Sequence, residues 1–228
     1  MPLGTAVVRW QHPTRGLLPP SEFITMAEES GLVRPLGAWV LGETLRQAES
    51  WRKEGGPAAG LEFAVNLSAR QLSDPELVTV VEGALRLRDV EPSHLLLEIT
   101  ETALMADPNG ALESLTALKN LGVGLAVDDF GTGYSSLTYL KKFPIDELKI
   151  DRSFINGLGS DSGDSAIVAS CIDLAHAVGI LAVAEGVETS VQVQTLKAMG
   201  CDLAQGYHFA RPLPAPALKE WLDAHADG

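Results

Sequence analysis

Short apolar runs alternate along this sequence with longer segments that have the periodicity of amphipathic helices. Such alternation is typical of βα units, whose strands lie parallel in one sheet. Hydrophobic residues make up 46% of the chain and aromatic residues only 6%, and this aliphatic composition suits buried parallel strands. We therefore predict an α/β fold. The predicted strands are Thr5–Trp10, Leu61–Leu67, His94–Ile99, Val123–Val127, Asp146–Ile150, Ile180–Ala184 and Asp202–Gly206.

Helix start and stop signals separate these strands. Glycines end helices well because they adopt left-handed backbone angles without strain. On this basis we predict a helix that Pro35 opens and Gly55 closes, a helix from Asn109 to Asn120 that closes at Gly122, and a helix from Thr189 to Met199 that closes at Gly200. The segment Ser73-Asp74-Pro75-Glu76 predicts a further helix start, with an N-cap, a first-turn proline and a capping-box glutamate.

The number of strands constrains the architecture further. A (β/α)₈ barrel needs eight strands to close its ladder of hydrogen bonds, and the sequence offers seven. The sequence also begins inside a predicted strand. We therefore expect a modified TIM (β/α)₈ barrel that lacks its first strand, or else a sheet that does not close. A length of 228 residues suits a single domain over residues 1–228.

Charge and cysteine content limit the possible partners and compartment. The net charge of −13 argues against a nucleic-acid polymer as partner, although an acidic protein can bind a small nucleotide when a metal supplies positive charge. Cys171 and Cys201 match no metal-binding spacing and no disulfide framework. Charged residues interrupt the most apolar stretch, from Ala166 to Val187, so we expect no membrane span. These observations predict a cytoplasmic protein.

Polar side chains stand at the carboxyl ends of six of the predicted strands. Barrel enzymes place their reacting groups at this end of the sheet. Carboxylates that converge there repel one another unless a cation binds, and oxygen ligands suit Mg²⁺ or Mn²⁺ better than zinc. The residues concerned are Asn66, Glu98, Glu101, Asp128, Asp129, Lys149, Asp151, Glu185 and Gln205.

The adjacent pair Asp128-Asp129 is the most informative of these features. Neighbouring carboxylates suit a two-metal phosphodiester hydrolase, because one can bridge both metals while the other binds the second. An alternative interpretation is an aspartate N-cap and a glycine turn before a helix that starts at Tyr134. The other strand ends supply further ligands, and for that reason we favour the metal site.

Taken together and in order, these motifs resemble the EAL family of cyclic-di-GMP phosphodiesterases. The resemblance runs from about Ala6 to Leu213 and rests on Asn66-Leu67-Ser68, Glu98-Ile99-Thr100-Glu101, Asp128-Asp129-Phe130-Gly131-Thr132-Gly133, Leu148-Lys149-Ile150-Asp151, Ala184-Glu185-Gly186-Val187-Glu188 and Gln205-Gly206-Tyr207. It implies a modified TIM barrel that hydrolyses cyclic di-GMP to pGpG with Mg²⁺ or Mn²⁺ in bacterial signalling. It also implies a homodimer formed through the helix after the Asp128-Asp129 loop.

The resemblance implies a role for each matched residue. The first metal would be held by Asn66, Glu98 and Asp128, and the second by Asp128, Asp129 and Glu185. Lys149 would orient or activate the attacking water, Gln205 would support the water network, and Glu101 would brace the Asp128-Asp129 loop. The substrate would meet Arg9 and the motif that contains Asp151.

One matched position departs from the family pattern. Thr5 stands where the family has the glutamate of its Glu-Ala-Leu tripeptide, which is a ligand of the first metal. A hydroxyl is a weak, neutral ligand, so we expect reduced or lost activity. Three hypotheses stay open: an impaired phosphodiesterase, a degenerate domain that binds cyclic di-GMP or a protein without turnover, and an incomplete fragment that needs complementation. A different metal-dependent barrel enzyme with Lys149 as base fits the chemistry but not the ordered motifs.

Overall fold

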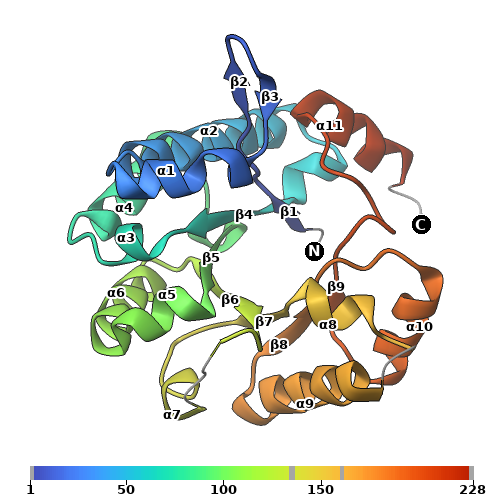
Figure 1. Cartoon of the computed structure of the whole chain (residues 1–228). Helices are drawn as coiled ribbons and strands as arrows, with labels where there is room; N and C mark the ends of the chain where they lie inside the picture. The colour runs from blue at the N-terminus through green and yellow to red at the C-terminus, as the bar shows by residue number, and fades with distance from the viewer. Residues whose placement is uncertain (1–2, 134–136, 160–161, 226–228) are drawn as a thin grey trace. The chain divides into compact units, whose positions relative to one another are not determined.

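A computed structural model describes residues 3–133, 137–159 and 162–225 (Figure 1). Its main sheet has the strand order β1-β4-β5-β6-β7-β8-β9. The seven strands are β1 (Leu3–Thr5), β4 (Glu62–Leu67), β5 (Leu95–Thr100), β6 (Gly124–Phe130), β7 (Glu147–Ile150), β8 (Leu181–Ala184) and β9 (Leu203–Ala204). The α/β fold class and the count of seven strands are thereby confirmed, and five of the strands lie within a residue or two of their predicted bounds.

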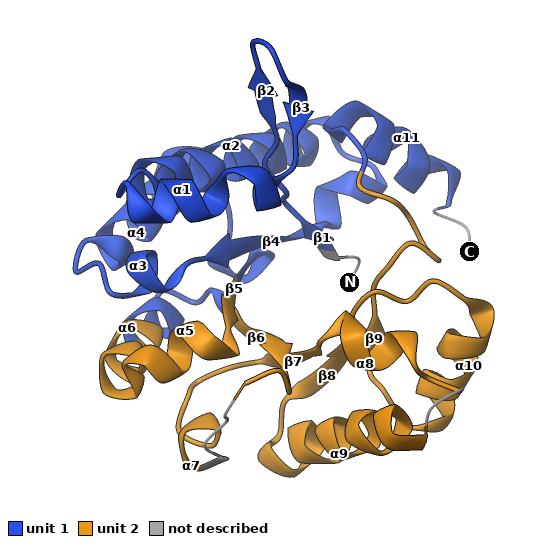
Figure 2. Ribbon diagram, in the orientation of Figure 1, with its two compact units in different colours: residues 1–97, 117–124, 213–228 blue, residues 98–116, 125–212 orange. Residues whose placement is uncertain are grey.

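The chain divides into two compact units, coloured separately in Figure 2. Unit 1 comprises residues 1–97, 117–124 and 213–228, and unit 2 comprises residues 98–116 and 125–212.

In unit 1, β1 pairs in parallel with β4, and a long helix covers them. This helix, α2 (Val33–Glu54), buries Leu45 and Trp51, and the Trp51 ring stacks on Phe63 of β4 with their centroids 5.8 Å apart. The remaining elements of the unit are η1 (Pro20–Glu22), α1 (Ile24–Glu29), η2 (Pro57–Gly60), α3 (Ala69–Leu72), α4 (Leu77–Arg88), η3 (Pro92–His94) and α11 (Ala215–Ala224).

The predicted strand Thr5–Trp10 is wrong in its extent. The parallel strand ends at Thr5, and Trp10 begins a separate antiparallel hairpin of β2 (Trp10–His12) and β3 (Gly16–Leu18). The His12 Nδ1 accepts hydrogen bonds from the backbone N–H groups of Thr14 and Arg15, each at 3.2 Å. Gly16 follows with φ = +76°, so the turn has a glycine where the backbone is left-handed.

Unit 2 contains the parallel strands β6, β7, β8 and β9, and most of their residues are buried. Its helices are α5 (Glu101–Ala106), α7 (Leu137–Leu140), α8 (Arg152–Asn156), α9 (Ser162–Val178) and α10 (Ser190–Ala198), and α6 (Pro108–Asn120) begins in this unit. The predicted helix start at Tyr134 lies outside the described residues. Within the described ranges, no helix has the length and apolar character needed to cross a membrane.

Most of the helix end signals hold. Gly55, Gly122 and Gly200 all have positive φ and follow the ends of α2, α6 and α10. The segment at Ser73 does not cap α4 as predicted: the N-cap of α4 is Glu76, without a side-chain cap, and Asp74 Oδ1 accepts from the Glu76 N–H at 3.1 Å. A reciprocal capping box lies earlier, between Ser68 and Gln71 of α3.

A second capping box begins α10 and allows a stability test. The Thr189 hydroxyl accepts from the Gln192 N–H at 3.2 Å, and Gln192 Oε1 accepts from the Thr189 N–H at 2.9 Å. Replacing an N-cap threonine by alanine typically costs about 1 kcal/mol. We expect Thr189→Ala to lower the free energy of unfolding by about that amount in urea titrations. The control Thr195→Ala removes an exposed mid-helix hydroxyl and should cause no loss, so equal effects of the two would refute the cap.

Candidate metal centre

An irregularity in β6 determines how the paired aspartates lie. Val127 pairs with Leu148 and Phe130 with Ile150, so β6 contains one residue more than β7 over this stretch, which is a β-bulge. Asp129, in the bulge, has φ = +54°, a left-handed conformation that aspartate tolerates better than most residues. Adjacent residues of a regular strand point to opposite faces. The bulge instead lets ligand oxygens of Asp128, Asp129 and Glu185 all lie within 4.8 Å of one another.

A buried lysine lies at the centre of the carboxylates in unit 2. The Lys149 side chain is only 2% exposed, and its ammonium lies 2.7 Å from Glu98 Oε1, 2.5 Å from Glu185 Oε1 and 3.4 Å from Asp128 Oδ1. The four residues come from the carboxyl-terminal halves of β5, β6 and β7 and from the residue directly after β8. Because parallel strands end at one edge of a sheet, residues distant in sequence meet at this lysine.

The cluster carries more negative than positive charge. Burial lowers the pKa of Lys149, but the surrounding carboxylates Glu98, Glu185 and Asp128 outweigh it and raise the pKa, so the ammonium stays charged. Burial also raises the pKa of Glu185 to about 7, with Lys149 lowering it and Asp128 raising it further. A single ammonium therefore faces three carboxylates here.

The second aspartate of the pair lies near Asp151. Burial, the charge of Asp128 and the charge of Asp151 raise the pKa of Asp129 above its usual value. Asp151 directly follows β7 and caps α8 by accepting from the Ser153 N–H at 2.9 Å. Burial alone would raise the pKa of Asp151, but its hydrogen bonds with Ser153 hold it below the usual value.

Glu101 connects β5 to the loop after the aspartates. It is buried, it is the first residue of α5, and its Oε2 accepts a hydrogen bond from the Gly131 N–H at 3.0 Å. A Cβ at Gly133 would lie 2.9 Å from Glu101 Oε1, so the glycine leaves room for this carboxylate. These contacts fix the backbone just beyond Asp129.

Gln205 approaches Glu185 because the segments after β8 and β9 are bonded to each other. The Gln205 side-chain amide donates to Glu185 Oε1 at 2.5 Å, and its backbone carbonyl accepts from the Val187 N–H at 3.0 Å. The next residue, Gly206, has φ = +154°, and a Cβ there would come within 2.3 Å of the Val187 backbone. Only glycine permits this close approach.

Three predicted site residues belong to unit 1 and are placed within it. Thr5 is the last residue of β1 and pairs with Ala64 of β4, two residues before Asn66. The Asn66 side chain is exposed near the carboxyl end of β4. Arg9 is exposed between β1 and β2, and its guanidinium donates to the backbone carbonyl of Val8 at 3.1 Å.

The donor set fits a hard divalent cation. Asp128, Asp129 and Glu185 offer only oxygen atoms, within the separation that one or two ions can span, and Glu98 lies against the same lysine. Oxygen-only sets suit Mg²⁺, Mn²⁺ or Ca²⁺ rather than zinc. Burial of several carboxylates with one lysine leaves an excess of negative charge that a cation would compensate.

Sequence reasoning did not find two features of this region. The bulge that redirects Asp129 was missed, although an aspartate before a glycine, as in Asp129-Phe130-Gly131, is compatible with a left-handed residue and a turn. The bond between Gly131 and Glu101 depends on packing between segments far apart in sequence, and no local signal could have predicted its partner atoms.

The fold and the oxygen-donor cluster describe an α/β protein with a candidate cation site at the carboxyl ends of parallel strands. Comparison with family models adds a specific match: residues 3–212 match the model described as the EAL domain. The chain belongs to the EAL domain family. The family resemblance read from the motifs is therefore confirmed.

Several curated proteins are similar to this chain in sequence. The chain is 48% identical over 213 residues to the bifunctional diguanylate cyclase/cyclic di-GMP phosphodiesterase MucR of Pseudomonas aeruginosa, covering 93% of this chain and 31% of that protein. It is 40% identical over 216 residues to the cyclic di-GMP phosphodiesterase PdeR of Escherichia coli, covering 95% of this chain and 32% of that protein. The chain thus spans about a third of the length of these relatives.

Solved structures agree in fold. A structure titled as the PaMucR phosphodiesterase in complex with c-di-GMP matches with a TM-score of 0.90 and 47% identity, covering 94% of this chain and 86% of that one. The FimX EAL domain from Pseudomonas aeruginosa, bound to c-di-GMP, matches with a TM-score of 0.84 and 25% identity, covering 92% and 83%. This similarity confirms the expected EAL-type α/β fold.

Proposed function

We propose that residues 1–228 form a single EAL-type domain that hydrolyses cyclic di-GMP to pGpG in a two-metal reaction with Mg²⁺ or Mn²⁺, in the bacterial cytoplasm. The observation that carries this proposal is the group of Asp128, Asp129 and Glu185, with ligand atoms within 4.8 Å, beside the buried Lys149. The relatives named as cyclic di-GMP phosphodiesterases support the substrate.

The contacts within unit 2 support a proposed role for several of these residues. Asp128, Asp129 and Glu185 would hold the second metal, and Asp128 would share the first with Glu98 and Asn66. Bound metal would supply positive charge to the phosphate and lower the pKa of a coordinated water. Lys149, within 2.5 Å of Glu185, would orient that water, and Gln205 would hold the Glu185 carboxylate in place. Glu101 would brace the loop through Gly131.

Two residues are proposed to contact the substrate. Arg9 carries an exposed guanidinium suited to a phosphate, and Asp151 stands beside Asp129 as a further acceptor.

A homodimer formed through α7 is part of the proposal, and size-exclusion chromatography with light scattering measures it directly.

Thr5 leads us to propose that turnover is impaired. It ends β1, one strand away from Asn66, and offers a neutral hydroxyl where the family pattern has a carboxylate. Loss of groups outside the ligand shell already costs roughly 10–100-fold in metal affinity or activity, so loss of a direct ligand should cost at least as much. Binding of cyclic di-GMP without turnover is the second candidate function, because the other proposed ligands are all present.

Restoring the carboxylate tests this interpretation. We expect Thr5→Glu to raise the rate of pGpG formation by roughly tenfold or more at limiting Mn²⁺, because a charged ligand strengthens the first metal site. The assay is chromatographic conversion of cyclic di-GMP to pGpG at matched metal concentrations.

The matched control is Thr5→Gln, because glutamine has nearly the same size as glutamate but carries no charge. It should leave the rate close to that of the unmodified chain. Full family-level activity in the unmodified chain would contradict the impairment, and cyclic di-GMP binding with no hydrolysis in either protein would favour the binding module.

A further inference from the structure

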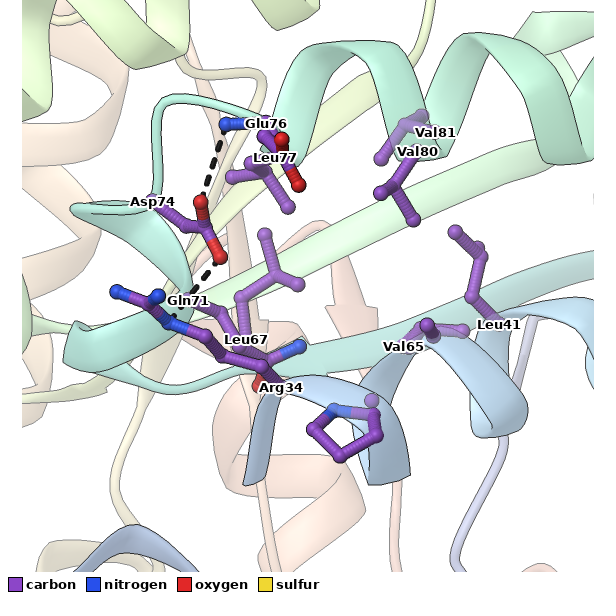
Figure 3. Close-up of a pocket in the computed structure, with 13 residues that line it drawn as sticks. Arg34, Leu41, Val65, Leu67, Gln71, Asp74, Glu76, Leu77, Val80 and Val81 are labelled. Carbon is purple, nitrogen blue, oxygen red and sulfur yellow. Dashed lines mark hydrogen bonds and ion pairs between the residues drawn. The ribbon is translucent and has the colours of Figure 1, made fainter. Parts of the chain in front are cut away.

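A pocket in unit 1 is lined by none of the residues proposed to bind metal or substrate. It encloses about 280 Å³ between α2, β4, α3 and α4 (Figure 3). Its walls are apolar side chains of these elements, chiefly Leu41, Val65, Leu67, Leu77, Val80 and Val81. An apolar cavity of roughly 150 Å³ is enough to bind benzene, and ligand pockets commonly begin near 300 Å³. The pocket therefore has room for a molecule of one ring and a short chain.

A single buried amide gives the pocket a polar side. Gln71 is 8% exposed, and its Oε1 accepts from the Ser68 N–H at 3.2 Å and from the Ser68 hydroxyl at 3.1 Å. Among the described residues, no hydrogen-bond acceptor is found for Gln71 Nε2. Figure 3 shows this amide turned toward the space that the apolar side chains line. The Nε2 atom is not among the fully buried side-chain atoms that lack a partner, so it keeps some accessible surface and its N–H groups are free to donate to a ligand in the pocket.

Gly37 makes room for that amide. A Cβ at Gly37, in α2, would lie 1.9 Å from Gln71 Nε2, closer than two non-bonded atoms can approach. The absence of a side chain at this position thus allows the Gln71 amide to lie where it does.

Charges at the mouth decide what kind of acceptor fits. Arg34 Nε is paired with Asp74 Oδ2 at 3.1 Å, and Glu76 also lines the pocket. One positive and two negative groups leave the mouth with a formal charge of −1, which disfavours an anion. An uncharged carbonyl oxygen meets the Gln71 amide without this repulsion.

From these observations we propose that the pocket binds a small, uncharged, mainly apolar molecule that carries one carbonyl group. The apolar body contacts Val65 and Leu67, and the carbonyl oxygen accepts from Gln71 Nε2. Val65 and Leu67 flank Asn66 in β4, so the molecule would contact the strand segment that carries a proposed metal ligand. The residues that line the pocket all belong to unit 1, and the proposal does not depend on the proposed hydrolysis.

The probe for this site is 4-phenylbutan-2-one, added to the ¹⁵N-labelled full chain. We expect saturable shifts of the Gln71 side-chain amide signals and of the Val65 and Leu67 backbone signals. Butylbenzene has the same carbon skeleton without the oxygen, and 3-phenylpropanoate has the same shape with a negative charge. Each should bind about fivefold more weakly or worse, since one hydrogen bond contributes about 1 kcal/mol. Absence of saturable shifts, or tighter binding of the anion, would overturn the proposal.

Two variants test the donor and the space separately. Gln71→Glu keeps the acceptor oxygens that cap α3 and removes both side-chain donors, so affinity for the ketone should fall about fivefold or more while affinity for butylbenzene stays within twofold. Val80→Phe places a ring at the partly exposed mouth and should abolish binding of both probes. The control Thr79→Phe adds the same ring at the neighbouring position of α4 and should leave the binding of both probes intact. Thermal unfolding verifies that each variant is folded, and unchanged ketone binding in either test variant would overturn the proposal.

Discussion

Replacing Lys149 by methionine should lower the rate of cyclic di-GMP hydrolysis by about 100-fold or more. Methionine has a similar length but no charge, so the change removes the ammonium that lies 2.5 Å from Glu185 and 2.7 Å from Glu98. A positioned group that orients or activates the nucleophile typically contributes 10²–10⁴-fold, which sets the expected size. The measurement is pGpG formation at saturating Mn²⁺.

The same variant should also be less stable when no metal is added. Glu98 is 1% exposed and loses the ammonium that lies 2.7 Å from its Oε1, and breaking a buried ion pair typically costs about 3–5 kcal/mol. Mn²⁺ should recover part of that loss, because a bound cation supplies the missing positive charge. Lys197→Met, at an exposed position of α10, is the control and should change neither property. Undiminished hydrolysis by the Lys149→Met protein would contradict the proposed role of this lysine in the reaction.

The second large effect concerns metal binding. We expect Asp128→Ala to weaken Mn²⁺ binding by about 100-fold or more in calorimetry, beyond the roughly 10–100-fold typical of outer partners. Asp128 is one of three residues whose ligand atoms lie within 4.8 Å, and it also lies 3.4 Å from the Lys149 ammonium. Without it, one ammonium faces fewer carboxylates and the remaining negative charge attracts a cation less.

A control with the same change in net charge isolates the local effect. Asp173→Ala removes an exposed carboxylate from α9 and should leave the Mn²⁺ isotherm as it is in the unmodified chain. Equal Mn²⁺ affinity of the Asp128→Ala and unmodified proteins would contradict the assignment of the metal centre.

Periodic features of the sequence predicted most of the sheet. The strand β5 begins with the apolar run Leu95-Leu96-Leu97 and is marked by Glu98, so its type and position could be inferred. The strand β7 (Glu147–Ile150) alternates charged and apolar residues, and its apolar members are Leu148 and Ile150. The N-terminal segment could not be predicted in the same way. Val7 and Val8 continue an apolar run, but the chain leaves the sheet at Thr5 and forms a hairpin whose turn depends on His12 and Gly16.

The candidate site shows the same limit at the level of side chains. That polar residues follow successive strands is visible in the sequence, and convergence follows from parallel pairing. Which atoms meet is not visible. The proximity of Lys149 to Glu98, 51 positions apart, and of Gln205 to Glu185 depends on strand register, which long-range packing determines. The capping box of Ser68 and Gln71 was missed because the motif at Ser73 matched the same pattern.

The extra residue of β6 has a consequence for any redesign of this scaffold. In a regular strand without the extra residue, Asp128 and Asp129 would point to opposite faces of the sheet. The capacity to gather two adjacent carboxylates therefore depends on chain length at one point rather than on the identity of the aspartates alone. A design that transfers only the acidic pair to a regular β-strand would keep the sequence of the motif but lose the arrangement of its two carboxylates.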